Sequence, residues 1–284
     1  MNLVRVITSG RSEVGEAPLW SSRENAVYWV DVLGARLHRL SLVDQAVDSW
    51  DMPEPICWVI ERESRPGFIA GFASGFAEVT FDPLVIRPIG NPEPDLPGNR
   101  LNDAKADFEG RIWAGTMASD CTGEAGSLYR LDCDCSWTRV DGPYGIPNGP
   151  AISVNGTALF HADTWKRLIY RFDLAPDGRL GPREMFIRFE RDWGFPDGMT
   201  LDADGGLWVA HWRGGRVSRF TSKGVLDRSI ELPTSQITSC TFSGPELDRM
   251  FVTSASYGRD DPHGGVLFEV DPGCRGLPTL RFGG

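Results

Sequence analysis

A short run of β-forming residues recurs six times along the chain, each time around one large apolar side chain. The apolar centres follow one another at intervals of 40, 44, 47, 48 and 43 residues. They are Trp29, Ile69, Trp113, Phe160, Trp208 and Phe251. Most copies are followed by a second alternating run, and the sequence shows no long helical periodicity. The pattern predicts an all-β fold, a six-bladed β-propeller with four-stranded blades, whereas a β-sandwich would not give six evenly spaced copies.

The repeats run through the whole chain, so residues 1–284 are expected to form a single domain. One strand-like run, LVRVITSG at 3–10, is left over before the first copy. We expect this run to complete the last blade by pairing with the runs at 266–271 and 279–282. Such pairing would join the first and last blades and remove the open sheet edge between them.

The charge balance of the sequence excludes two classes of partner. The chain carries 29 Lys and Arg against 39 Asp and Glu, a net charge of −10 at pH 7. Neither a nucleic acid nor an anionic membrane is expected to bind it, because both need a basic patch. The N-terminal residues lack the apolar segment of a signal peptide, and no run approaches the ~18 apolar residues of a membrane span. A cytoplasmic location is therefore the simplest expectation, and the oligomeric state stays open.

The cysteines are scattered along the chain and are expected to be reduced thiols. Cys133 and Cys135 are spaced like half of a metal site. No second pair of Cys or His lies nearby at a suitable spacing, so a structural or incidental role is expected for them.

Another short run precedes each apolar centre, and a propeller would place it innermost, along the central channel. These runs begin 11–13 residues before the centre, at Glu16, Ile56, Asn102, Asn148, Asp197 and Thr238. Equivalent positions of a radial repeat converge at one end of its axis. Four carboxylate or amide side chains are therefore expected to share one space.

Carboxylates crowded into one space repel each other and lose solvation, so a bound cation is the natural solution. Oxygen-only ligands suit one divalent cation such as Ca²⁺, Mg²⁺ or Mn²⁺, with Zn²⁺ and Fe²⁺ also open. The alternative is that Asn148 and Asp197, each followed by glycine, only cap turns. Four polar residues in phase favour the cation.

Several motifs together resemble the SMP-30/gluconolactonase/regucalcin-like family of six-bladed propellers. They are GEAPLW, RLNDAKAD followed by GRIWAGTM, PNGPAIS, and PDGMTLDADGGLWVA. The similarity runs from about residue 12 to the end of the chain. The resemblance implies hydrolysis of sugar lactones assisted by a divalent cation.

The resemblance also implies a role for individual residues. The family's metal ligands fall on Glu16, Asn148 and Asp197 of this chain, the same residues that the spacing selects. A cation can polarise a lactone carbonyl and lower the pKa of a bound water, and Asp197 is our candidate general base.

The family's substrate contacts fall on Arg100 and Asn102, with Asp120 where the family often has glutamate. Tyr144 and Trp193 precede two of the channel runs on expected loops, and could form a rim that packs against a sugar ring or could simply be exposed.

Other functions remain open. One alternative is a non-enzymatic propeller with a structural central cation, and another is a hydrolase of aryl esters or phosphotriesters. A structural site would not need the substrate set of Arg100, Asn102 and Asp120. The sequence leaves open whether a pentonic or a hexonic lactone would be the substrate, because loops around the channel determine that choice.

Overall fold

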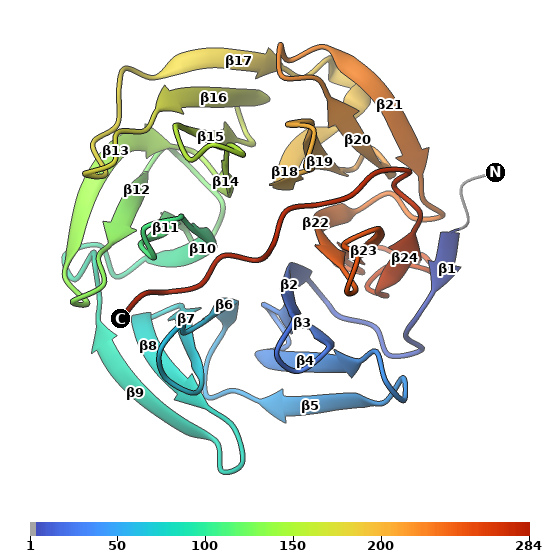
Figure 1. Cartoon of the computed structure of the whole chain (residues 1–284), viewed down its shortest axis with the longest axis horizontal. Coiled ribbons are helices and arrows are strands. Elements are labelled where there is room, and N and C mark those ends of the chain that lie inside the picture. Colours follow the sequence, from blue (N-terminus) through green and yellow to red (C-terminus); the bar gives the residue numbers. More distant parts are fainter. Residues whose placement is uncertain (1–3) are drawn as a thin grey trace.

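Six antiparallel sheets of four strands stand around a central axis in the computed structural model, which describes residues 4–284 (Figure 1). The first blade is built from β2 (Gly15–Ser21), β3 (Ala26–Asp31), β4 (Arg36–Ser41) and β5 (Val47–Asp51). The second consists of β6 (Ile56–Glu61), β7 (Phe68–Phe72), β8 (Gly75–Thr80) and β9 (Val85–Gly90). The third contains β10 (Asn99–Ala106), β11 (Ile112–Ala118), β12 (Gly126–Leu131) and β13 (Trp137–Tyr144).

The remaining blades follow the same plan. The fourth blade has β14 (Pro147–Ile152), β15 (Ala158–Asp163), β16 (Leu168–Asp173) and β17 (Glu184–Arg188). The fifth has β18 (Phe195–Leu201), β19 (Leu207–Trp212), β20 (Arg216–Phe220) and β21 (Leu226–Glu231). The sixth has β22 (Ile237–Ser243), β23 (Arg249–Ser254), β24 (Phe268–Val270) and β1 (Val4–Val6). The six-bladed prediction is confirmed, and the helical part of residues 4–284 is a single 3₁₀ turn at Arg191–Trp193.

A repeated turn fixes the central tryptophan of two blades by a hydrogen bond. Asp107 and Asp202 each stand six residues before a fully buried tryptophan, Trp113 or Trp208. Each carboxylate accepts backbone N–H groups of its own turn and the indole N–H of that tryptophan, at 2.9 Å in both blades. A buried indole donor needs such a partner, so the turn and the core residue form one unit.

The N-terminal strand completes the last blade, as the sequence predicts. In this pairing β1 lies antiparallel to β24, with Val4 opposite Val270. The ring is therefore closed between the two ends of the chain. No helix within the described residues has the length and apolar character needed to cross a bilayer.

The second half of the closure prediction is wrong, because residues 279–282 do not join the last blade. They belong to a C-terminal strap, residues 271–284, that runs across one end of the central channel (Figure 1). The strap contacts four blades through backbone bonds, namely Ala203 N to Arg275 O, Gly276 N to Leu247 O, Phe282 N to Glu61 O and Gly283 N to Gly110 O. The outer edge of the sixth blade already carries β1. The apolar side chains of the strap cover the channel end instead.

Phe282 is the main anchor of this strap. Its side chain is fully buried, and its backbone bonds to both Glu61 and Glu63. We expect Phe282→Ala to lower the free energy of unfolding by about 3–5 kcal/mol, the usual cost of deleting a buried phenylalanine. Arg275→Ala, an exposed change in the same strap, should alter it by less than about 0.5 kcal/mol in urea unfolding. Equal effects of both changes would contradict the anchoring role.

Candidate functional site

An irregularity in strand pairing shapes the channel end opposite the strap. In the innermost strand of every blade the register with the second strand shifts near the strand's N-terminal end. In β2, for example, Glu16 pairs with Val30, whereas Leu19 pairs with Tyr28. Such β-bulges redirect side chains that regular pairing would send elsewhere.

The bulges also change how the innermost strands align with one another, compared with the alignment that the sequence suggests. Glu16 and Asn148 are the last paired residues before their bulges, whereas Asn102 and Asp197 lie inside theirs. The four residues are therefore not equivalent positions of the repeat. The bulges bring the side chains of these four residues together.

Glu16 and Asp197 come from the first and fifth blades and meet near the axis. Asp197 is buried, and Glu16 is partly exposed. Burial, followed by the charge of Glu16, raises the pKa of Asp197 well above the usual range of an aspartate, and the two carboxyl groups are close enough to share a hydrogen bond. Burial likewise raises the pKa of Glu16 to about 8.

A third carboxylate at the site, that of Asp103, is one that sequence reasoning missed. Asp103 is buried in the bulge of β10 and accepts hydrogen bonds from Gly149 N at 2.8 Å and Ala104 N at 2.7 Å. Its charge raises the pKa of both Glu16 and Asp197. The RLND motif contained the signal, because its Asp directly follows the Asn that the resemblance selects.

The amide of Asn148 is held in one orientation. Its Nδ2 donates to Thr164 Oγ1 at 2.9 Å, and that hydroxyl donates to Pro196 O at 2.7 Å. The amide nitrogen is therefore hydrogen-bonded to a partner outside the site. The carbonyl oxygen, Oδ1, accepts a hydrogen bond from Asn102 Nδ2 at 2.8 Å and remains a ligand candidate with a second lone pair.

Arg100 and Asn102 of the third blade form a chain of hydrogen bonds with Asn148. Arg100 Nη1 donates to Asn102 Oδ1 at 2.9 Å and to Leu101 O at 2.8 Å. Asn102 also donates to Pro147 O at 2.8 Å. Both side chains are half-buried, so they border the site and remain accessible from it.

The structure does not bring Asp120 to this group. Asp120 is exposed on the loop between β11 and β12, where its carboxylate accepts hydrogen bonds from Thr122 N at 2.9 Å and Thr122 Oγ1 at 2.8 Å. The rim prediction for Tyr144 is wrong, because this residue is fully buried and its hydroxyl donates to Asp141. Trp193 is half-buried and packs against Phe189, with ring centres 5.6 Å apart.

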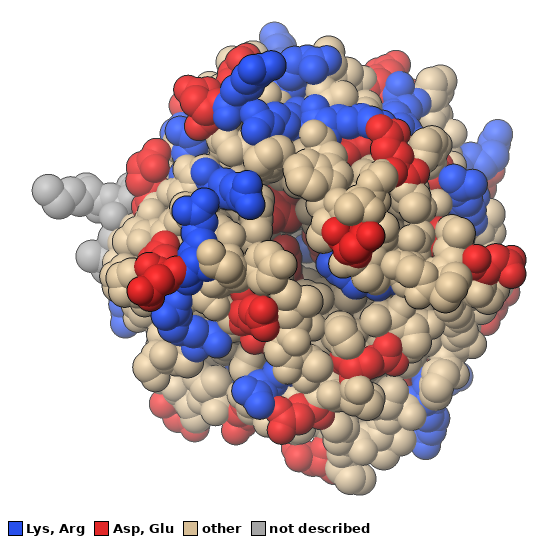
Figure 2. All heavy atoms as spheres, turned by 180° about the vertical axis from the view of Figure 1, so that it is seen from behind, with Lys and Arg blue, Asp and Glu red and all other residues tan. Residues whose placement is uncertain are grey.

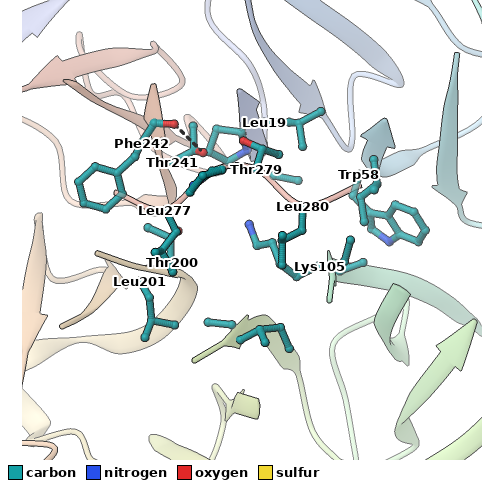
Figure 3. Close-up of a pocket in the computed structure, with 18 of the residues that line it drawn as sticks. Leu19, Trp58, Lys105, Thr200, Leu201, Thr241, Phe242, Leu277, Thr279 and Leu280 are labelled. Atoms are coloured by element: carbon teal, nitrogen blue, oxygen red, sulfur yellow. Dashed lines mark hydrogen bonds between the residues drawn. The ribbon is translucent and has the colours of Figure 1, made fainter. Parts of the chain in front are cut away.

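The site lies toward the end of the channel opposite the strap. Figure 2 shows the face opposite the strap, which is hollowed near its middle, with acidic atoms deep in the hollow and basic atoms beside them. Further along the channel lies a cavity of about 80 Å³, lined mainly by apolar residues that include Leu277 and Leu280 of the strap (Figure 3). Lys105 also lines this cavity, and its charge partly offsets the burial that raises the pKa of Glu16 and Asp103.

The donor set fits a hard divalent cation. Within residues 4–284, neither Glu16, Asp103 nor Asp197 forms a salt bridge, so in their ionised forms these carboxylates have no directly bonded cation. No three His, Cys, Asp or Glu side chains in that range are grouped as a complete metal site. A cation would therefore need Asn148 Oδ1 beside the carboxylates of Glu16 and Asp197. Among the described residues, Cys133 and Cys135 therefore do not belong to a group of metal-binding side chains either.

Comparison with known proteins gives consistent results. Residues 14–256 match the SMP-30/Gluconolactonase/LRE-like region. A 6-deoxy-6-sulfogluconolactonase of Pseudomonas putida is 33% identical over 93% of this chain and 94% of its own length. A pentonolactonase of Haloferax volcanii is 33% identical over 99% of this chain and 98% of its own. The structure of a calcium-binding protein, regucalcin, from Agrobacterium tumefaciens matches with a TM-score of 0.92 at 28% identity, covering 99% of this chain and 98% of that one.

Proposed function

Since the chain belongs to the SMP-30/gluconolactonase/LRE-like family, we propose that it hydrolyses sugar lactones to aldonic acids with the help of one divalent cation. The main support is the gathering of Glu16, Asn148 and Asp197 beside the hydrogen-bonded pair Arg100 and Asn102. Two relatives named as lactonases support the substrate class. The regucalcin structure, named as a calcium-binding protein, makes Ca²⁺ the first cation to test, ahead of Mg²⁺, Mn²⁺, Zn²⁺ and Fe²⁺.

The roles follow from the chemistry of each side chain. Glu16, Asn148 Oδ1 and Asp197 would hold the cation, which when bound supplies a Lewis acid to the lactone carbonyl. A carboxylate oxygen of Asp197 accepts the proton of the attacking water as general base. Arg100 and Asn102 orient the ring oxygens, and the guanidinium stabilises the negative charge that develops on the carbonyl oxygen. Asp120 stays a predicted substrate contact.

Hydrolysis of a lactone panel tests this function directly. Pentonic and hexonic lactones would be followed with a pH indicator, with added Ca²⁺ and with a chelator. We expect cation-dependent acceleration of at least one lactone. A protein that binds Ca²⁺ but accelerates no lactone would support the alternative, a non-enzymatic cation-binding propeller.

Asn102→Ala should separate substrate binding from cation binding. Asn102 is proposed to contact substrate, so we expect kcat/KM to fall roughly 10–100-fold. The Kd for the cation, measured by titration calorimetry, should stay within about threefold of wild type, because the proposed ligands remain. A loss of cation affinity that matches the loss of activity would place Asn102 among the ligands instead.

A further inference from the structure

A large aromatic side chain stands exposed at the open end of the channel. Trp165 is 51% exposed and lies in the loop between β15 and β16, two residues after Asp163, which pairs with Pro147 beside the site. Its predecessor, Thr164, is the hydroxyl that bonds to Asn148 and to Pro196 O. The backbone that carries Trp165 is therefore fixed directly to two strands of the site.

The indole itself is also held in place. Its Nε1 donates to Cys121 O at 2.9 Å, on the loop between β11 and β12. Its ring meets Phe195 edge to face, with centres 5.9 Å apart. A Cβ at Gly145 would lie 2.7 Å from Trp165 Cδ1, so the ring rests on bare backbone there. An exposed surface side chain of this size is usually mobile, and this one is fixed on three sides.

The same contacts connect the third and fourth blades across the opening. Besides the bond from Trp165 to Cys121 O, Lys166 Nζ lies 2.8 Å from Glu124 on the neighbouring loop and 3.4 Å from Asp163. That loop also carries Asp120, next to Cys121. Trp165 therefore holds the loop with the predicted substrate contact against the rim of the site.

We propose that Trp165 is a substrate-binding residue whose exposed indole packs against the C–H face of the sugar ring at the channel opening. The inference rests on the proposed lactonase function and adds a determinant of substrate binding to it. Sugar rings present apolar C–H faces between their hydroxyls, and a fixed indole binds such a face without losing side-chain entropy on binding. This role replaces the one that the sequence suggested for Tyr144.

Binding of the aldonate product tests the proposal independently of turnover. Five- and six-carbon aldonates would be titrated calorimetrically into wild type, Trp165→Ala and Trp165→Phe, with Ca²⁺ present. We expect Trp165→Ala to weaken aldonate binding about tenfold and to raise KM for the lactone similarly, with little change in kcat. Trp165→Phe keeps a ring and should lose less. The Ca²⁺ affinity should be unchanged in both variants.

Phe108→Ala is the matched control, because Phe108 is 52% exposed and lies in the turn between β10 and β11, at the end of the channel that carries the strap. This change should leave aldonate affinity as in wild type. If wild type turns over lactones while Trp165→Ala binds aldonate and lactone as tightly as wild type, the proposal is overturned and the lactonase function stands. If wild type neither turns over lactones nor binds aldonates, the function fails and the proposal with it.

Discussion

Asp197→Asn is expected to reduce lactone turnover roughly a thousandfold or more while the protein stays folded. The amide has nearly the volume of the carboxylate but cannot accept the proton of the attacking water, and it removes one charge from the cation site. The cation-free variant should even be more stable than wild type, because burial next to Glu16 and Asp103 disfavours the charged form of Asp197. Kinetics, thermal melting and Ca²⁺ titration would measure the three effects.

Asp202 in the same blade provides the matched control. It is also buried, but its carboxylate accepts hydrogen bonds from Gly206 N, Trp208 Nε1 and Arg219. Although burial acts in the opposite direction, these bonds lower the pKa of Asp202. Asp202→Asn should therefore lower stability while the remaining folded protein keeps its activity. Near-wild-type turnover in Asp197→Asn would remove the assignment of the general base.

The cation-free protein is expected to lose stability as the pH rises from about 6.5 to about 8. Burial raises the pKa of Glu16 to about 8, compared with about 4.3 in an unfolded chain. Between these values the folded state binds more protons than the unfolded state, so the free energy of unfolding falls as pH increases. The raised pKa values of Asp103 and Asp197 act in the same direction. Bound cation should remove this dependence by stabilising the ionised groups.

Titration of the histidines does not change the free energy of unfolding above a pH of about 6.5. Burial lowers the pKa of His38, His161 and His211 below their ordinary 6.5, so their contribution to stability grows with pH only up to about that value. Melting temperatures would be recorded across this pH range with chelator and with Ca²⁺. Glu16→Gln should make the decline seen in chelator shallower, because it removes one of the three carboxyl groups that titrate. A decline of equal slope in Glu16→Gln and wild type would refute the explanation.

The fold could be predicted almost completely from the sequence, because each blade repeats a local pattern that needs no knowledge of distant contacts. The strap could not be placed in this way. Residues 279–282 have an alternating pattern that suits an edge strand, but β1 already occupies the free edge of the sixth blade. Which of two competing segments takes that edge depends on the whole ring, which the pattern of one segment does not contain.

The residues of the candidate site could be predicted from the sequence better than their arrangement in space. The spacing selected Glu16, Asn148 and Asp197, but it treated them as equivalent and so missed the bulges. In a regular strand Asn102 and Asp103 would point to opposite faces. The bulge of β10 lets both contact β14, Asn102 through Asn148 and Asp103 through Gly149 N. A period of two therefore does not predict that Asp103 joins Asn102 at the site, whereas the observed pairing shows it there.

The strap runs across one end of the central channel, and the hollowed face lies at the other end. Under the proposed function, we expect a lactone to enter through the hollowed face and the acid formed from it to leave through the same opening. One molecule has to leave before the next can arrive. Inhibition by the accumulated acid should then be purely competitive with respect to the lactone.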